Sequence, residues 1–269
     1  MGSPTERERA GFVQIEGSPT SPVILHVPHA SKTIPAEVRR RIVATDRQLE
    51  AELAEITDTG TDRLAAVAAG IAARRPWQFV NALSRLVVDP ERFLDEREEL
   101  NAVGRGAVYT RRCDGEPLRD ERTWSAADTQ ALVDEVFRPY ADAMTDLTRA
   151  RLEACGRAVV VDVHSYPARP SAYEQHAEGP RPEVCLGTDA QHTPPELVAA
   201  ARAAFDEAGF EVGLNSPFAG CYIPLPLLGD VRVSALMVEI RKDVYLADPA
   251  RQAALGTAVA AVVDYANTG

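Results

Sequence analysis

Short apolar runs alternate along the chain with stretches whose apolar residues recur every three to four positions. The first pattern is typical of strands and the second of helices, and their alternation indicates a mainly parallel sheet covered by helices. The clearest strand patterns lie at 23–27 (VILHV), 158–163 (AVVVDV) and 234–240 (SALMVEI). Because these runs are almost wholly apolar, we expect both faces of the strands to be buried.

Other segments give weaker or longer patterns. Further strand patterns lie at 77–80, 86–88 and 183–187, and helical spacing covers 48–73, 125–154, 195–208 and 249–265. We expect Gly60 to interrupt the first helix. Ser125 and Asp128 predict a capping box at the start of the second, Pro139 a kink within it, and Gly156 its end.

The length and apolar content suit one large α/β domain. The chain has 269 residues, of which 45% are hydrophobic, and we expect a three-layer domain over residues 11–269 behind a flexible N-terminus at 1–10. Residues 90–122 are charge-rich and glycine-dotted with little periodicity. A stretch of this kind predicts a functional loop or lid, and a disordered surface insertion is the equal alternative.

Charge limits the classes of partner. The formal net charge of -11 argues against nucleic acid or an anionic membrane as the main partner, although a few arginines in a cleft could still bind a small anionic substrate. The N-terminus lacks an apolar signal region and no later run reaches about 18 apolar residues, which predicts a soluble, cytoplasmic protein. The four cysteines are scattered without a CxxC pair, so we expect them to be reduced.

Histidines at strand ends are the main candidates for chemistry. The sequence has His26, His29, His164, His176 and His192. In open α/β sheets, ligands bind at the carboxyl ends of strands, and His29 and His164 follow the two best strand patterns. Two imidazoles and a carboxylate form the three-ligand site of catalytic zinc, with water as the fourth ligand. The alternative is that each histidine is a hydrogen-bonded core or loop residue, and whether His26 joins the site stays open.

Carboxylates near these histidines add to the pattern. Asp162 precedes His164 by two residues, so it points to the same side of the strand and can orient the imidazole. Glu239 lies in an apolar strand, where a carboxylate needs a cation, a metal or a catalytic role; an ion pair with Arg241 is the alternative. The third metal ligand has several local candidates: Glu55, Asp58 and Asp62.

Arginines suggest how a substrate is held. Arg85 and Arg92 flank the run LVVD, and guanidinium groups bind carboxylates bidentately, which favours a substrate with two carboxylates. Glu91 would oppose such a substrate if it pointed inward, but neighbours on a loop after a strand tend to alternate in direction. We therefore expect Arg85 or Arg92 to point inward and Glu91 outward. The chain has no G-x-S-x-G, P-loop or H-E-x-x-H motif.

Seven short motifs in order resemble the N-formylglutamate amidohydrolase family. They are HVPHAS (26–31), TDTGTDRL (57–64), SRLVVD (84–89), DGEPL (114–118), VVDVHSYP (160–167), NSPFAGCY (215–222) and MVEIRKDVY (237–245). Each motif alone is weak, but together they span nearly the whole chain. The resemblance implies a single α/β domain with a mainly parallel mixed sheet, similar to the zinc carboxypeptidases and related amidohydrolases.

The resemblance also implies roles for individual residues. It implies that His29, Asp58 and His164 bind Zn²⁺ or another divalent metal, with Asp162 behind them, and that Glu239 is the general base and Arg85 a substrate or transition-state contact. The implied substrate contacts are Arg92, Asn215, Tyr222 and Arg241.

The implied reaction is hydrolysis of the formamide bond of an N-formyl amino acid, with N-formylglutamate as the expected substrate. The family usually has D-L-N-R where this chain has Asp89-Pro90-Glu91-Arg92, so Glu91 adds a negative charge near a site for an anion. The alternatives are a zinc amidase or carboxypeptidase for another N-acyl amino acid or small peptide, and an inactive binding protein of the same fold. The oligomeric state stays open.

Overall fold

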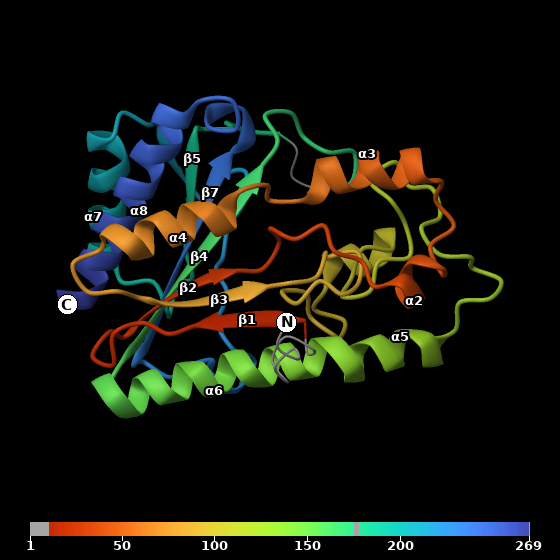
Figure 1. Ribbon diagram of the computed structural model, residues 1–269, viewed down its shortest axis with the longest axis horizontal. Helices are drawn as coiled ribbons and strands as arrows, with labels where there is room; N and C mark the ends of the chain where they lie inside the picture. The colour runs from red at the N-terminus through yellow and green to blue at the C-terminus, as the bar shows by residue number, and fades with distance from the viewer. Residues whose placement is uncertain (1–10, 175–177, 269) are drawn as a thin grey trace, which may run out of the picture.

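A seven-stranded sheet forms the centre of the computed structural model, which describes residues 11–174 and 178–268 (Figure 1). The strand order is β1-β3-β2-β4-β7-β5-β6. The strands are β1 (Phe12–Ile15), β2 (Val23–Val27), β3 (Trp77–Asn81), β4 (Ala158–Tyr166), β5 (Val184–Gly187), β6 (Val212–Leu214) and β7 (Val233–Arg241). The expected flexible N-terminus at 1–10 and His176 lie outside the described residues.

The sheet is mixed and mainly parallel, as predicted. Strands β3, β2, β4 and β7 run parallel to one another, and β5 is parallel to β6. The antiparallel pairs are β1 with β3 and β7 with β5. The sequence pattern missed β1 and β6, which are the two edge strands and are only 4 and 3 residues long.

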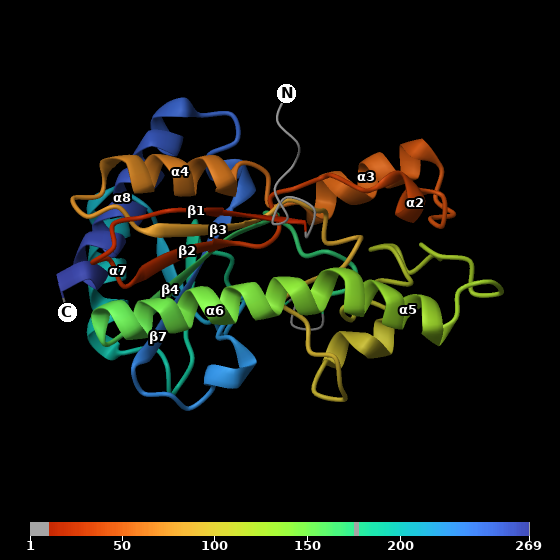
Figure 2. The same cartoon turned by 60° about the horizontal axis from the view of Figure 1, so that its bottom comes forward.

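Helices cover both faces of the sheet, so the predicted three-layer α/β domain is confirmed. Helices α4 (Thr61–Ile71), α7 (Pro195–Glu207) and α8 (Pro249–Thr268) pack on one face, and α6 (Arg138–Cys155) packs on the other (Figure 2). Alternate residues of each central strand pack against opposite layers. Leu25 and Val161 pack in the core beneath α4, α7 and α8, whereas Ile24 and Val160 pack in the core beneath α6. This alternation decides which strand side chains can meet at a site.

The remaining helices refine the predicted boundaries. The helix expected at 48–73 is two helices, α3 (Asp46–Ile56) and α4, separated by a turn in which Gly60 adopts a left-handed φ of 86°. The helix expected at 125–154 begins with α5 (Ala126–Leu132), continues through a π-helical turn at Val133–Phe137 and ends with α6. The capping box of Ser125 and the end at Gly156 are confirmed, and the π-helical turn ends at Phe137, two residues before Pro139. The kink at Pro139 stays a prediction.

The strand predicted at 86–88 is wrong. These residues form a turn, although the side chains of Leu86 and Val87 are fully buried. Leu86 packs with Tyr109 and Leu118 of the following segment. The apolar run therefore reflects burial beneath another part of the chain, which a short run cannot distinguish from a strand.

The segment 90–122 is ordered and packed over the carboxyl ends of the strands. It lies beside α2 (Ala36–Arg39) and α3 at the end of the molecule toward which β2 and β3 point (Figure 1). Its one regular element is a short 3₁₀ helix at Glu99–Val103, but Tyr109, Leu118 and Arg119 are buried. This burial does not fit a disordered insertion; movement of the segment as a lid stays a prediction.

A buried ion pair ties this segment to α3. Arg105 is 1% exposed, and its Nη1 donates to Glu52 Oε1 over 2.8 Å, with Glu52 itself 5% exposed. The Arg105 guanidinium also lies over the rings of Tyr109 and Tyr173, at 4.3 and 4.1 Å from their centroids. Removing one partner of such a pair leaves a buried charge without compensation, which is strongly destabilising.

We expect Glu52→Gln to lower the free energy of unfolding by about 3 kcal/mol, measured by urea denaturation. Glu50→Gln removes the same charge from an exposed position on the same helix, and we expect it to change stability by less than about 0.5 kcal/mol. Equal effects of the two substitutions would contradict a structural role for the Glu52–Arg105 pair.

Two further findings concern the described part of the chain. No helix in it is long and apolar enough to cross a membrane. Cys113, Cys155, Cys185 and Cys221 are all free thiols, as the scattered spacing predicted.

Candidate functional site

Four of the candidate side chains share one face of the sheet. His26 of β2 pairs with Asp162 of β4, and His164 of β4 pairs with Glu239 of β7. Paired residues of neighbouring strands, and residues two apart on one strand, point to the same face. All four therefore point toward the α6 layer, near the carboxyl ends of their strands.

His29 and Asp58 reach the same place from two loops. His29 follows β2 by two residues, and Asp58 lies between α3 and α4. The Asp58 backbone N–H donates to the carbonyl of His29 over 3.0 Å, which holds the loops together. Both side chains are buried, as is that of His164.

The donor atoms of these three residues form a compact triangle. His164 Nδ1 lies 3.0 Å from Asp58 Oδ2 and 3.3 Å from His29 Nδ1, and His29 Nδ1 lies 3.7 Å from Asp58 Oδ2. Tetrahedral zinc with bonds of about 2.0–2.2 Å has ligands about 3.3–3.6 Å apart. This donor set therefore fits a divalent metal ion.

A carboxylate lies at the Nε2 atom of each imidazole, on the side away from the triangle, and helps to point Nδ1 into the triangle. His29 Nε2 hydrogen-bonds Asp89 Oδ1 over 2.9 Å. His164 Nε2 lies 3.0 Å from Asp162 Oδ2, an ion-pair distance without hydrogen-bond geometry. A carboxylate at Nε2 favours a proton there and leaves the Nδ1 lone pair for a metal. Asp162 was predicted for this role, whereas the role of Asp89 at the end of SRLVVD was missed.

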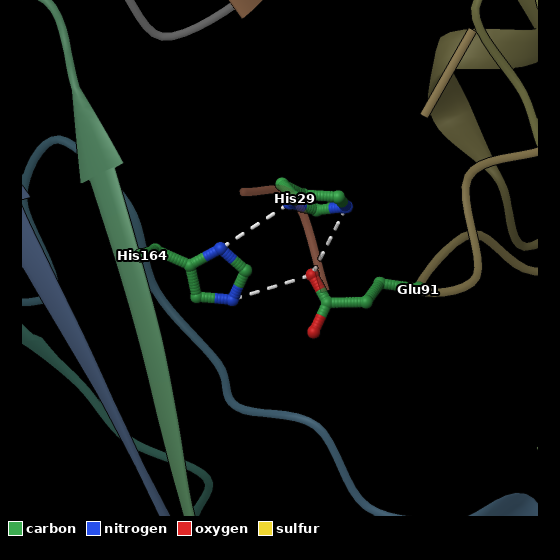
Figure 3. A group of neighbouring side chains, drawn as sticks. All are labelled: His29, Glu91 and His164. Atoms are coloured by element: carbon green, nitrogen blue, oxygen red, sulfur yellow. Dashed lines mark hydrogen bonds and ion pairs between the residues drawn. The ribbon is translucent and has the colours of Figure 1, made fainter. Parts of the chain in front are cut away.

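Glu91 points into the site, so the prediction that it points outward is wrong. Its Oε2 lies 3.3 Å from His164 Nε2 and 3.7 Å from His29 Nε2 (Figure 3). The Glu91 backbone N–H donates to Asp89 Oδ1 over 3.3 Å, an aspartate turn to which the alternation of strand residues does not apply.

Glu91 also completes two other groups that could hold a metal, one with His29 and His164 and one with His26 and Asp162. The first group would use the Nε2 atoms of the histidines, and that of His29 is already bound to Asp89 at 2.9 Å. The second would use His26 Nδ1, which is bound to Asp162 Oδ1 at 2.9 Å. We therefore favour the Nδ1 triangle with Asp58.

Asp89 also contacts both candidate arginines, Arg85 and Arg92. Arg85 binds Asp89 Oδ2 through Nε at 3.1 Å and Nη2 at 2.6 Å, and Arg92 Nε lies 3.3 Å from the same oxygen. The Tyr109 hydroxyl donates to Asp89 Oδ2 over 2.5 Å. The guanidinium groups lower the pKa of the Asp89 carboxyl well below its usual value against the opposing effect of burial. Both arginines thus lie beside the histidine pair.

Within residues 11–174 and 178–268, Glu239 is a buried carboxyl without a hydrogen-bond or ion-pair partner. Its side chain is 8% exposed, and its Oε2 has no hydrogen bond. Burial raises the pKa of Glu239 to about 8, although the nearby His164 opposes this shift. The alternative ion pair with Arg241 is wrong, because Arg241 binds Asp243 Oδ1 at 2.8 Å and the carbonyl of Arg181 at 2.6 Å.

Opposite charges within the site favour the ionised forms of Asp58 and His164. Burial alone would raise the pKa of Asp58, but hydrogen bonds and charge on His164 and His29 lower it below its usual value. Burial would lower the pKa of His164, but the charges of Asp162 and Glu91 raise it well above its usual value. The site is thus built to hold positive charge between its carboxylates.

Other predicted residues differ in how near they lie to this centre. Tyr222 is adjacent: its N–H donates to Asp162 Oδ2 over 3.3 Å, and its ring centroid lies 4.5 Å from that of His26. Asn215 is exposed and its amide binds Thr188. The substrate contacts predicted for Asn215 and Arg241 stay predictions.

The other two candidates for the third ligand are placed elsewhere. Glu55 binds the Ser171 hydroxyl, and Asp62 is exposed on α4. Of the three, Asp58 alone contacts His29 and His164.

Two further groups support the site and were not predicted for it. Tyr140 of α6 bonds His26 Nε2 over 2.6 Å, and His26 Nδ1 in turn bonds Asp162. The Lys242 ammonium donates to the carbonyl of Glu55 over 2.6 Å, near Asp58 and Glu239. Their sequence signals were weak, because a lone tyrosine on a helix and a lysine after a strand are common surface patterns.

Comparisons with known proteins agree with the seven motifs. The family model of N-formylglutamate amidohydrolase matches residues 21–246. The structure is similar to that of N-formylglutamate amidohydrolase from Ralstonia eutropha JMP134, with a TM-score of 0.78 and 23% identity over 96% of this chain and 97% of that one. It is also similar to a gene product from Agrobacterium tumefaciens, with a TM-score of 0.70 and 21% identity over 97% of this chain and 96% of that one.

Among curated proteins, no sequence matches. At these identities, the two solved structures establish the fold alone, while the family model covers most of the chain. The chain therefore belongs to the N-formylglutamate amidohydrolase family.

Proposed function

We propose that this protein is a metal-dependent hydrolase that cleaves the formamide bond of an N-formyl amino acid to formate and the free amino acid. Membership of the family supports hydrolysis of an amide bond. The observation that carries the metal dependence is the triangle of His29 Nδ1, His164 Nδ1 and Asp58 Oδ2, buried beside a carboxyl without a partner. This is the donor set of a catalytic zinc site with an open position.

The proposed ligands are His29, Asp58 and His164, for Zn²⁺ or another divalent ion. When bound, such an ion lowers the pKa of a coordinated water and polarises the carbonyl oxygen of a substrate. Asp89 and Asp162 orient the two imidazoles from behind. Losing partners of this kind commonly weakens metal affinity by 10–100-fold.

Glu239 has the position and environment of a general base. Its buried Oε2 has no competing hydrogen bond, so it can accept a proton from the attacking water and return it to the departing nitrogen. Arg85 keeps one guanidinium nitrogen outside its contacts with Asp89 and Tyr109. We assign that nitrogen to the developing negative charge on the formyl oxygen.

The substrate class is proposed from the family to which the chain belongs. N-formylglutamate, the substrate in the family's name, is the first compound to test, with Arg92 as the proposed contact for a carboxylate. The preference for two carboxylates assumed that Glu91 points outward, and its inward position removes that support. Another N-acyl amino acid or a small peptide is the alternative within the same chemistry.

We expect the purified protein to release formate from N-formyl amino acids and to lose this activity when a chelator removes the metal. Adding back about one equivalent of Zn²⁺ per chain should restore activity, because the favoured site of His29, Asp58 and His164 binds one ion. Formate is measured with a coupled dehydrogenase assay, and metal by elemental analysis. Full turnover in protein shown to be metal-free would contradict the proposal, and stable metal binding without turnover of any N-acyl amino acid would favour a binding protein.

A further inference from the structure

In the part of the chain that the structure describes, the Glu91 carboxylate accepts no hydrogen bond, unlike those of Asp58, Asp89 and Asp162, and only imidazoles lie within ion-pair distance of it. Asp58 lies between two imidazoles, Asp89 binds two arginines, and Asp162 binds His26 and the Tyr222 backbone. Among the described residues, no arginine or lysine lies within ion-pair distance of Glu91, and its Oε1 is buried without a hydrogen bond.

The Glu91 carboxylate is nevertheless placed at the centre of the group. Its Oε2 lies near the Nε2 atoms of His164 and His29, at 3.3 and 3.7 Å (Figure 3). Its Oε1 lies 3.6 Å from His26 Nδ1. The side chain is 16% exposed, so it is accessible to a ligand but not freely solvated. A charge in such a position interacts more strongly with a neighbouring charge than one on the surface does.

The balance of charge around the site leaves little room for a second negative charge on the substrate. The anionic side chains are Asp58, Asp89, Glu91, Asp162 and Glu239, and the cationic ones beside them are Arg85, Arg92 and Lys242. Both arginines already share Asp89. With Glu239 ionised, as a general base must be, a divalent metal would bring the sum to about zero, so no net positive charge is left for a second substrate carboxylate.

We propose that Glu91 is a specificity-determining residue that selects N-acyl amino acids with a neutral or cationic side chain and disfavours those with a second carboxylate. This inference rests on the proposed function for the class of substrate. In it, Arg92, with 25% of its side chain exposed and one contact to Asp89, binds the α-carboxylate. Glu91 places its charge beside the same histidines, at their Nε2 atoms, so a second substrate carboxylate near it would meet like charge and a neutral group or an ammonium would not.

The test compares kcat/KM for N-formylmethionine, Nα-formyl-lysine and N-formylglutamate. We expect the wild type to favour the first two over N-formylglutamate by tenfold or more. Glu91→Gln keeps the size of the side chain and removes its charge, so we expect it to shift the ratio toward N-formylglutamate by at least tenfold, or about 1.4 kcal/mol. Glu96→Gln removes the same charge from an exposed position of the same segment and should leave the ratio unchanged.

Three results would overturn the inference. The wild type could prefer N-formylglutamate, Glu91→Gln could leave the ratio unchanged, or Glu91→Gln could lose the metal while Asp58→Asn keeps it, which would make Glu91 a ligand. If Glu91→Gln fails to fold, Glu91→Asn, which restores the asparagine of the D-L-N-R pattern, provides the same comparison.

Binding measurements separate this inference from the proposed function. Calorimetric titration of N-formylmethionine and N-formylglutamate into the wild type does not require turnover. Absence of formate release from all three compounds would refute the proposed function, while tighter binding of N-formylmethionine would still support the role of Glu91. Tighter binding of N-formylglutamate would overturn that role whatever the catalytic result.

Discussion

Replacing His164 by alanine is expected to remove both the bound metal and the hydrolytic activity. His164 Nδ1 is the donor closest to both other proposed ligands, at 3.0 Å from Asp58 Oδ2 and 3.3 Å from His29 Nδ1. Without it, two ligand atoms remain, and a catalytic zinc site needs three from the protein. Elemental analysis of the purified variant should give much less than the metal content of the wild type, and formate release should fall to the background rate.

A matched control distinguishes loss of a ligand from loss of a buried ring. His192 is also buried, but its Nδ1 bonds the carbonyl of Val233 and its Nε2 accepts from the Gly229 N–H, away from the site. We expect His192→Ala to keep its metal even if its melting temperature falls. A stoichiometric metal content in His164→Ala would refute the assignment of His164 as a ligand.

The fold was predictable wherever burial leaves a strong periodic pattern. Residues 158–163, apart from Asp162, are apolar on both faces because β4 lies between α6 on one side and α4, α7 and α8 on the other. The run 23–27 reflects the same position for β2. The edge strand β6 has 3 half-buried or exposed residues, so it leaves no such pattern. Leu86 gives the opposite error, a false strand pattern, because a turn packed beneath another segment is as apolar as a strand.

The site was predictable where it depends on strand geometry. Asp162, His164 and Glu239 share a face because of residue parity and strand order, and parity can be determined from the sequence. Asp89 and Glu91 depend instead on a turn after residue 88, whose direction is set by hydrogen bonds to Asp89. The alternation rule fails there, and it gave the wrong direction for Glu91.

Replacing Glu239 by glutamine is expected to lower kcat by two or more orders of magnitude while leaving fold and metal intact. A general base typically contributes 10²–10⁴-fold, and glutamine keeps the shape of the side chain without its proton affinity. The variant should keep the wild-type metal content, because Glu239 lies outside the proposed ligand triangle. The steady-state rate of formate release at saturating substrate gives kcat, and elemental analysis gives the metal content.

The stability of this variant decides between a catalytic and a structural Glu239. The Oε2 atom is buried without a hydrogen bond, and a buried carboxyl in that state costs free energy in the folded protein. Glutamine removes the charge of the ionised form but keeps a buried polar group of the same shape, so the melting temperature should change little even as turnover collapses. A carboxylate that served as an ion-pair partner would behave in the opposite way, because its loss would leave a buried cation unpaired. A lower melting temperature with unchanged kcat would therefore refute the general-base assignment. A stable, metal-loaded and nearly inactive variant would support it, because a purely structural role of Glu239 does not explain that combination.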